Sequence, residues 1–147
     1  MIFLDTGFVF ALVYADDVHH ARVREVLESY RGRPLADFVV TTNHVVAETV
    51  TLLLRKAGAD ARARHQLAVR VGQQLMAEIF GQVHHATTED EQAALAYLAR
   101  HQDKTYSFVD CLSFVVMERL GVQEAFTVDG DFTHRFIARP GPLPKML

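Results

Sequence analysis

Short apolar runs and longer segments with helical spacing alternate along the chain. The short runs are rich in β-branched and aromatic residues, which is typical of strands; they cover residues 2–4, 38–42, 82–87 and 124–129. The longer segments repeat apolar residues every three or four positions and predict helices; they cover residues 7–14, 18–30, 43–56, 60–80, 88–100 and 107–120. Residues 31–37 predict a loop, residues 131–137 a short helix or turn, and the proline-rich residues 138–147 an extended tail.

Capping residues predict where several helices begin and end. Asn43 is expected to cap the third helix. Thr88, with Glu91 three positions later, predicts a capping box at the start of the fifth. Gly58 and Gly121 follow the third and sixth helices, where a glycine commonly ends a helix.

Strands that alternate with helices predict an α/β fold, with a central parallel sheet and helices on both of its faces. The 147 residues contain no repeat or long linker, so we expect a single domain over residues 1–147. In such folds, ligands bind outside the carboxyl ends of the strands. Asp5 follows the first predicted strand and Asp129 ends the last one, so both carboxylates are expected at the same edge of the sheet.

Two further acids interrupt apolar helices. Glu48 lies in the segment VVAETVTLLL, at the rim of its apolar face. Asp110 lies in SFVDCLSFVVM, on the face that also carries Phe114 and Met117. Both side chains are therefore expected to point toward packed surroundings, where a carboxylate needs a partner.

Each acid also has a purely structural explanation. Asp110 has capping-box spacing with Ser107, Glu48 could pair with Arg55 or Lys56, and Asp5, Asp129 and Asp131 could be helix caps or turn residues. Taken together, however, these explanations require four carboxylates to converge by accident. A shared divalent cation explains all four, because Mg²⁺ and Mn²⁺ prefer carboxylate oxygens and assist the cleavage of phosphodiesters.

Composition narrows the class of protein. One cysteine, Cys111, excludes a disulfide framework and favours the cytosol. We find neither a signal-peptide pattern nor an apolar run of about 18 residues, so we expect a cytoplasmic protein without a membrane span. The net charge of −3 is unlike that of most nucleic-acid-binding proteins, but without the four acids it would be about +1. Basic residues gather between positions 55 and 70, as an RNA contact or as a solvated helix face.

Four motifs occur in a recognisable order: LDT at residues 4–6, AE at 47–48, SFVDCLS at 107–113 and FTVDGDF at 126–132. This ordered set resembles the PIN-domain nucleases, and most of all the VapC-like toxins of toxin–antitoxin pairs. The resemblance covers essentially the whole chain. It implies a PIN-like α/β/α sandwich and a metal-dependent endoribonuclease that uses Mg²⁺ or Mn²⁺.

The resemblance also assigns residues. It matches Asp5, Glu48, Asp110 and Asp129 to the catalytic, metal-binding acidic quartet, Asp131 to a further acid at the metal, and Thr6, Ser107 and Thr127 to polar positions near it. One departure is Gly7, where many relatives carry Ser or Asn, so that a side-chain contact is absent there. The implied partners are an RNA substrate, a small antitoxin protein and a second copy of the chain.

Three other functions fit parts of the pattern. A non-catalytic PIN-like module would bind RNA or protein without cutting it. A Mg²⁺-binding phosphoacceptor domain also gathers aspartates at strand ends, but it needs a lysine after a late strand, where this chain has Asp129. Asp5-Thr6-Gly7 matches the aspartic-protease signature, but that chemistry needs paired aspartates in an all-β frame. The endoribonuclease therefore remains the leading hypothesis.

Overall fold

Five parallel strands form the central sheet of the protein, whose computed structural model describes residues 1–145. The strands are β1 (Ile2–Leu4), β2 (Val39–Thr42), β3 (Gln82–His84), β4 (Glu124–Thr127) and β5 (Ile137–Pro140). Their order across the sheet is β3-β2-β1-β4-β5, and every neighbouring pair is parallel. The first strand in the sequence therefore lies at the centre, with β4 beside it.

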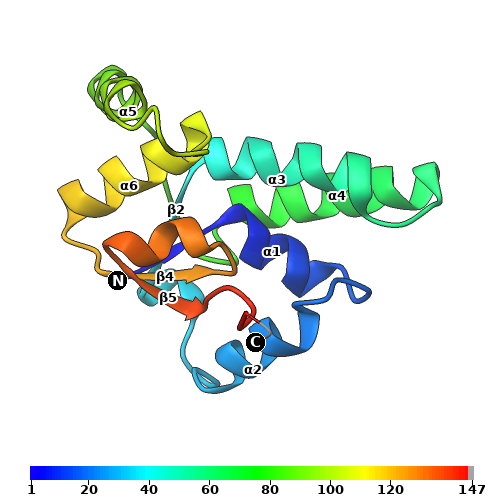
Figure 1. Cartoon of the computed structure of the whole chain (residues 1–147). Helices are drawn as coiled ribbons and strands as arrows, with labels where there is room; N and C mark the ends of the chain where they lie inside the picture. Colours follow the sequence, from blue (N-terminus) through cyan, green and yellow to red (C-terminus); the bar gives the residue numbers. More distant parts are fainter. Residues whose placement is uncertain (146–147) are drawn as a thin grey trace.

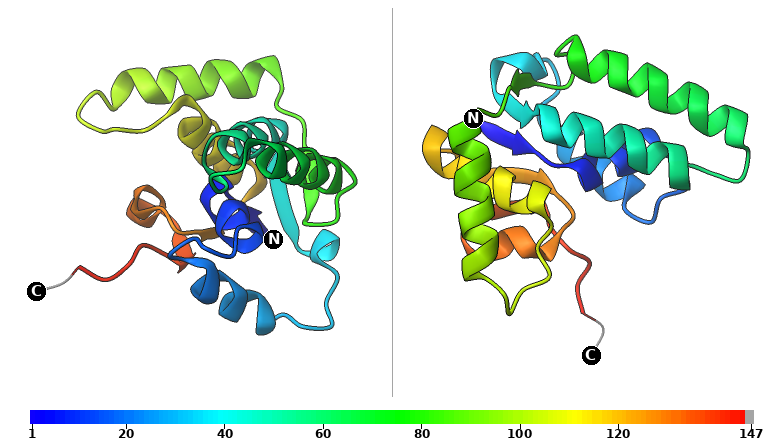
Figure 2. Two further views of the ribbon diagram at one scale, coloured as in Figure 1. Left: turned by 90° about the vertical axis from the view of Figure 1, so that its right-hand side faces the viewer. Right: turned by 90° about the horizontal axis from the view of Figure 1, so that it is seen from above.

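Helices connect the strands and cover both faces of the sheet (Figures 1 and 2). They are α1 (Thr6–Val13), α2 (His20–Glu28), α3 (Asn43–Lys56), α4 (Ala61–Met76), α5 (Thr88–Arg100) and α6 (Phe108–Leu120), with two 3₁₀ segments, η1 (Leu35–Asp37) and η2 (Gly130–His134). The predicted α/β fold with a parallel sheet is confirmed. In residues 1–145 we find no helix with the length and apolar character that a membrane crossing requires.

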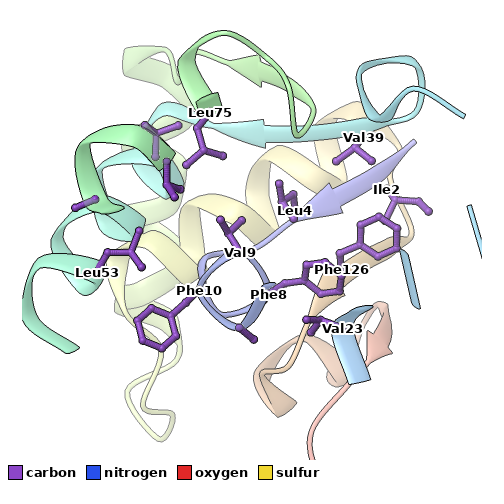
Figure 3. Close-up of a cluster of buried hydrophobic side chains, with 14 of the residues drawn as sticks. Ile2, Leu4, Phe8, Val9, Phe10, Val23, Val39, Leu53, Leu75 and Phe126 are labelled. Carbon is purple, nitrogen blue, oxygen red and sulfur yellow. The ribbon is translucent and has the colours of Figure 1, made fainter. Parts of the chain in front are cut away.

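The sheet separates two hydrophobic cores, because successive strand residues point to opposite faces. Ile2 and Leu4 face the first core, where α1 and α2 pack together with the inner sides of α3 and α4; Figure 3 shows this cluster. Phe3 of the same strand faces the second core, formed with α5, α6 and η2. Helices of both layers therefore pack on the sheet, and the predicted site residues lie at the carboxyl edge of its strands.

Helices α3 and α4 lie side by side and extend away from the sheet (Figures 1 and 2). Gly72 permits this close approach, because a Cβ at that position would lie 2.9 Å from the Cγ2 atom of Val50. The predicted helix at residues 60–80 is too long: α4 ends at Met76, and Glu78 adopts a positive φ of 61°.

Two predicted caps are wrong by one residue. The N-cap of α3 is Thr42, whose hydroxyl accepts a hydrogen bond from the amide of Val45 at 3.2 Å. Asn43 instead accepts one from the amide of Ala86. Helix α5 is capped by Thr87, with Asp90 rather than Glu91 completing the capping box. The capping box between Ser107 and Asp110 at α6 is confirmed, and Gly121 ends that helix in the left-handed conformation.

The predicted extended tail contains a strand. Residues Ile137–Pro140 pair with β4 as the edge strand β5. The guanidinium of Arg22 on α2 then donates to the carbonyl oxygens of Pro140, Gly141 and Pro142, which fixes the chain after β5. Of the predicted tail, residues 146–147 lie outside the described part of the chain.

Candidate metal centre

Asp5 follows β1 and Asp129 follows β4, two neighbouring strands that pair in register at Leu4 and Phe126. The two acids are linked through Thr127. Its hydroxyl donates to Oδ2 of Asp5 at 2.9 Å and accepts from the amide of Asp129 at 3.0 Å. Parallel pairing therefore brings both acids to the carboxyl edge of the sheet, with one threonine orienting them.

Asp110 reaches this edge from the first turn of α6. One of its oxygens, Oδ2, accepts from the amide of Ser107 at 2.9 Å in the capping box. The helix N-terminus favours a negative charge at this place. The cap therefore holds the carboxylate in one orientation, and a cap and a metal ligand are compatible roles for this residue.

Asp131 follows Asp129 in the short segment η2. Its amide donates to Oδ1 of Asp129 at 2.9 Å, so the backbone folds back over that carboxylate. One carboxylate oxygen each from Asp110, Asp129 and Asp131 lies within 4.8 Å of the other two. These three half-buried groups are close enough together to share one ion.

Glu48 lies at the margin of this cluster. It is half-buried on α3, and its negative charge is among the causes that raise the pKa of Asp110. It is not one of the three acids within 4.8 Å of one another. In residues 1–145 it makes no ion pair with Arg55 or Lys56, the structural partners that its position on the helix suggested.

Burial and like charge disfavour ionisation of the clustered acids. Asp5 is only 5% exposed, and burial, followed by the charges of Asp110 and Asp129, raises its pKa to about 7 against a lowering by the Thr127 hydroxyl. Burial also raises the pKa of Asp110, to about 6, with the Asp129 and Glu48 charges adding to it. The pKa of Asp129 is raised by burial as well. A cation at this edge would relieve this repulsion and favour the ionised forms.

The residues present fit a hard divalent cation. The donors are carboxylate oxygens, which suit Mg²⁺ and Mn²⁺ better than softer metals. Next to Asp5, the buried hydroxyl of Thr6 has no hydrogen-bond partner in the part of the chain that the structure describes. A buried hydroxyl of this kind normally has a partner, and an ion with its water ligands would supply one.

The sequence pattern did not indicate three aromatic side chains near this edge. His134 of η2 contacts Asp131 and Tyr97, and the ring of Tyr106 stacks on His134. Tyr97 lies on α5 at the helical spacing of an ordinary packing residue. Nothing in its helical spacing distinguishes it, because the contact with His134 joins residues 37 positions apart.

Known proteins are similar to this chain over most of its length. The family model of the PIN domain matches residues 2–135. The "23S rRNA-specific endonuclease VapC20" of Mycobacterium tuberculosis, from strains CDC 1551 / Oshkosh and H37Rv, is 39% identical over 133 residues, or 90% of this chain and 92% of the relative. The crystal structure of VapC20, described as a "Sarcin-Ricin loop cleaving toxin", superimposes with a TM-score of 0.78 at 37% identity, over 91% of this chain and 94% of that one. The chain therefore belongs to the PIN-domain family.

Proposed function

We propose that this protein is a divalent-metal-dependent endoribonuclease and the toxin of a toxin–antitoxin pair, acting in the cytoplasm. The observation that carries the proposal is the gathering of the Asp110, Asp129 and Asp131 carboxylates within 4.8 Å of one another at the carboxyl edge of the sheet. The relatives that match 90% of this chain are named as endonucleases, which supports the same reaction.

In this proposal, Asp5, Glu48, Asp110 and Asp129 are catalytic acids, and together with Asp131 they hold one or two Mg²⁺ or Mn²⁺ ions. The ion supplies Lewis acidity, which polarises the phosphodiester and makes an attacking water more acidic. Other residues of the chain orient the carboxylates. Thr127 orients Asp5, and the Ser107 cap orients Asp110, so that the carboxylates are arranged before substrate binds.

The substrate class in this proposal is RNA. Because the relatives are named for action on 23S rRNA and the sarcin–ricin loop, an RNA stem-loop with that sequence is the first substrate to test. A carboxylate site acts on the phosphate, which every RNA shares, so the chosen base sequence depends on contacts outside the acids. Basic residues 55–70 on α3 and α4 are candidates for such contacts.

The decisive experiment compares cleavage of this stem-loop in Mn²⁺, in Mg²⁺ and in excess EDTA. We expect cleavage with either ion and none in EDTA. Asp110→Asn should be inactive, whereas Asp37→Asn, an exposed acid on η1, is the matched control and should cut normally. Cleavage at full rate in EDTA would contradict the metal mechanism, and binding without cleavage in Mn²⁺ would favour a non-catalytic module.

A homodimer and an antitoxin partner complete the proposal. Light scattering on the purified chain tests whether it is a homodimer. Co-purification with a small protein encoded by a neighbouring gene tests the antitoxin partner, and the bound antitoxin should suppress RNA cleavage. A monomer that no neighbouring gene product binds would remove both partners from the proposal while leaving the nuclease activity to its own test.

A further inference from the structure

A hydrogen-bonded relay connects α5 with the turn that carries Asp131. The hydroxyl of Tyr97 lies 3.0 Å from Nε2 of His134, and Nδ1 of the same ring bonds to the backbone carbonyl of Asp131. A carbonyl oxygen only accepts, so Nδ1 carries the proton, and in the neutral ring Nε2 then accepts from Tyr97. The Tyr97 hydroxyl thus donates to the His134 imidazole, and the imidazole donates to the Asp131 carbonyl.

Aromatic packing restrains the same imidazole. Tyr106 stacks on it with a centroid distance of 5.6 Å, and Phe114 meets it edge-on at 5.0 Å. Tyr97 itself is buried, with 4% of its surface exposed. Packing in the core beneath α5 and α6 therefore fixes the position of Tyr97. The hydrogen bond from Tyr97 in turn restrains His134.

The relay acts on a short segment that the fully buried ring of Phe132 anchors in the core. Segment η2 is a 3₁₀ turn of five residues, a geometry with weak internal hydrogen bonds. Both backbone polar groups of Asp131 are nevertheless tied: its amide donates to Asp129, and its carbonyl accepts from His134. These two bonds set the direction in which the Asp131 carboxylate leaves the backbone.

We propose that His134 and Tyr97 are positioning residues of the candidate metal centre, which fix the backbone of Asp131 so that its carboxylate stays beside those of Asp110 and Asp129. The inference rests on the proposed function. Three carboxylates within 4.8 Å of one another repel each other in the absence of a cation. Phe132 anchors the turn but does not bond to the Asp131 carbonyl, so without the relay that repulsion would move the Asp131 carboxylate away from the other two.

The relay does not make His134 a catalytic acid or base. Both ring nitrogens are engaged, one with Tyr97 and one with Asp131, so neither is free to exchange a proton with a substrate. Its role is the orientation of a ligand, and removal of outer groups that orient metal ligands commonly lowers metal affinity about 10- to 100-fold.

Variants of the full chain separate the two bonds. Tyr97→Phe keeps the buried ring and removes the hydroxyl. His134→Asn keeps an amide donor in place of Nδ1 and loses the contact with Tyr97, and His134→Ala removes both contacts. Tyr106→Phe is the matched control, because it removes a hydroxyl from the same aromatic cluster that takes no part in the bonds between Tyr97, His134 and Asp131.

The primary measurement is Mn²⁺ affinity by calorimetry, with melting in EDTA as the measure of folding. We expect Tyr97→Phe and His134→Asn each to weaken Mn²⁺ binding about tenfold, the double variant to be no worse than either, and His134→Ala to be weaker still. Tyr106→Phe should bind as wild type does. Cleavage by Tyr97→Phe should recover at saturating Mn²⁺, which a loss of catalytic chemistry would not allow.

Several results would overturn the inference. Wild-type Mn²⁺ affinity in both Tyr97→Phe and His134→Ala would remove the relay from the site. Equal losses in Tyr97→Phe and Tyr106→Phe would assign the effect to general packing, as would a lower melting temperature in EDTA with unchanged Mn²⁺ affinity of the folded protein. If wild type itself binds no Mn²⁺, the proposed function fails along with the relay; if wild type binds and the variants match it, only the relay fails.

Discussion

Asp5 is a carboxylate in a place where ionisation is unfavourable, because burial raises its pKa from 3.8 to about 7. The folded chain therefore binds this proton more tightly than the unfolded chain does. The resulting contribution to the free energy of unfolding is fully present below the ordinary pKa of 3.8 and is lost as the pH rises through about 7. Asp110, with a pKa raised to about 6, acts in the same direction over a lower window.

Metal-free protein should therefore lose stability as the pH rises from about 5 to about 8. We expect a loss of at least about 1 kcal/mol, since one pKa unit corresponds to about 1.4 kcal/mol. Asp5→Asn should flatten this dependence and raise the melting temperature in EDTA near the upper end of the range. Thermal melts across pH in EDTA measure both effects. An Asp5→Asn chain that melts below wild type throughout would indicate that the carboxylate is a structural cap.

Mn²⁺ should reverse the destabilisation of wild type. At a hundred times its dissociation constant, an ion that binds only the folded state adds about 2.7 kcal/mol to the free energy of unfolding. Asp5→Asn and Asp129→Asn should each lose most of that gain. Melts with and without Mn²⁺ provide the measurement, and a full gain in either variant would remove that acid from the proposed ligand set.

Substitutions of the four proposed catalytic acids should not have additive effects. Asp5→Asn, Glu48→Gln, Asp110→Asn and Asp129→Asn are each expected to reduce RNA cleavage at least about a hundredfold, and a second substitution to add little, because all disable one site. Asp131→Asn should reduce it less, since Asp131 lies beyond the strand end on a short turn. Cleavage rates of the single and double variants decide this.

The comparison of Glu48 with Asp131 is the sharpest part of that experiment. The sequence resemblance places Glu48 in the quartet and Asp131 outside it, whereas the three acids nearest one another include Asp131 and not Glu48. Full activity of Glu48→Gln together with a loss of activity in Asp131→Asn would therefore place Asp131 in the catalytic quartet instead of Glu48.

At the scale of helices and strands, local patterns could predict the elements but not the exact ends. Thr87 and Thr88 are adjacent residues of equal capping ability, and of Thr42 and Asn43 the asparagine is generally the better cap. A contact from a distant residue decides the second pair: the Asn43 side chain is engaged by Ala86, which lies 43 positions away. Strand β5 was missed for a related reason, because a proline within a strand is tolerated mainly at a sheet edge, and the sequence does not reveal which strand is the edge.

Asp90 illustrates a contact that joins three elements. Its carboxylate is 2% exposed and bonds to His84 of β3 at 3.0 Å and to Arg119 of α6, besides capping α5. Burial raises its pKa, but hydrogen bonds from Thr87, His84 and Arg119 outweigh burial and lower it. This carboxylate is therefore ionised and fully partnered inside the fold.

Asp90→Ala should lower the free energy of unfolding by about 1–3 kcal/mol, because it removes a capping-box acid and the hydrogen bonds that this buried carboxylate accepts from His84 and Arg119. Urea unfolding measures this loss. Glu89→Ala is the matched control: Glu89 also contacts Arg119, at 3.4 Å, but it is exposed and should cost less than about 1 kcal/mol. RNA cleavage per folded molecule should not change in either variant, and a selective loss of cleavage in Asp90→Ala would place Asp90 in the reaction.

At the scale of the whole molecule, the proposed toxin role predicts an effect on growth. Expression of the wild-type chain alone should slow the growth of a bacterial host, and Asp110→Asn at the same protein level should not. Growth curves with matched immunoblots measure this. Equal growth for both would count against the toxin role while leaving cleavage in vitro to its own test.

The convergence of the acids could be predicted from topology, since parallel strands present their carboxyl ends at one edge. This rule alone predicts that Asp5 and Asp129 lie close together. The outer contacts could not be predicted in the same way. The bond between Tyr97 and His134 depends on how α5 packs over α6 and η2, and packing of that kind leaves no local pattern in the sequence.

The placement of β4 beside β1 has a consequence for the order of synthesis. Asp5 is translated before Thr127, which orients it and comes 122 positions later. Until β4 has been made, a growing chain has neither this threonine nor Asp129, and the central strand lacks one of its two neighbours. A nascent chain therefore cannot assemble the acidic site until the segment that carries β4 has been translated. In a protein proposed to cut RNA, the strand order of the fold thus delays assembly of the acidic site during synthesis.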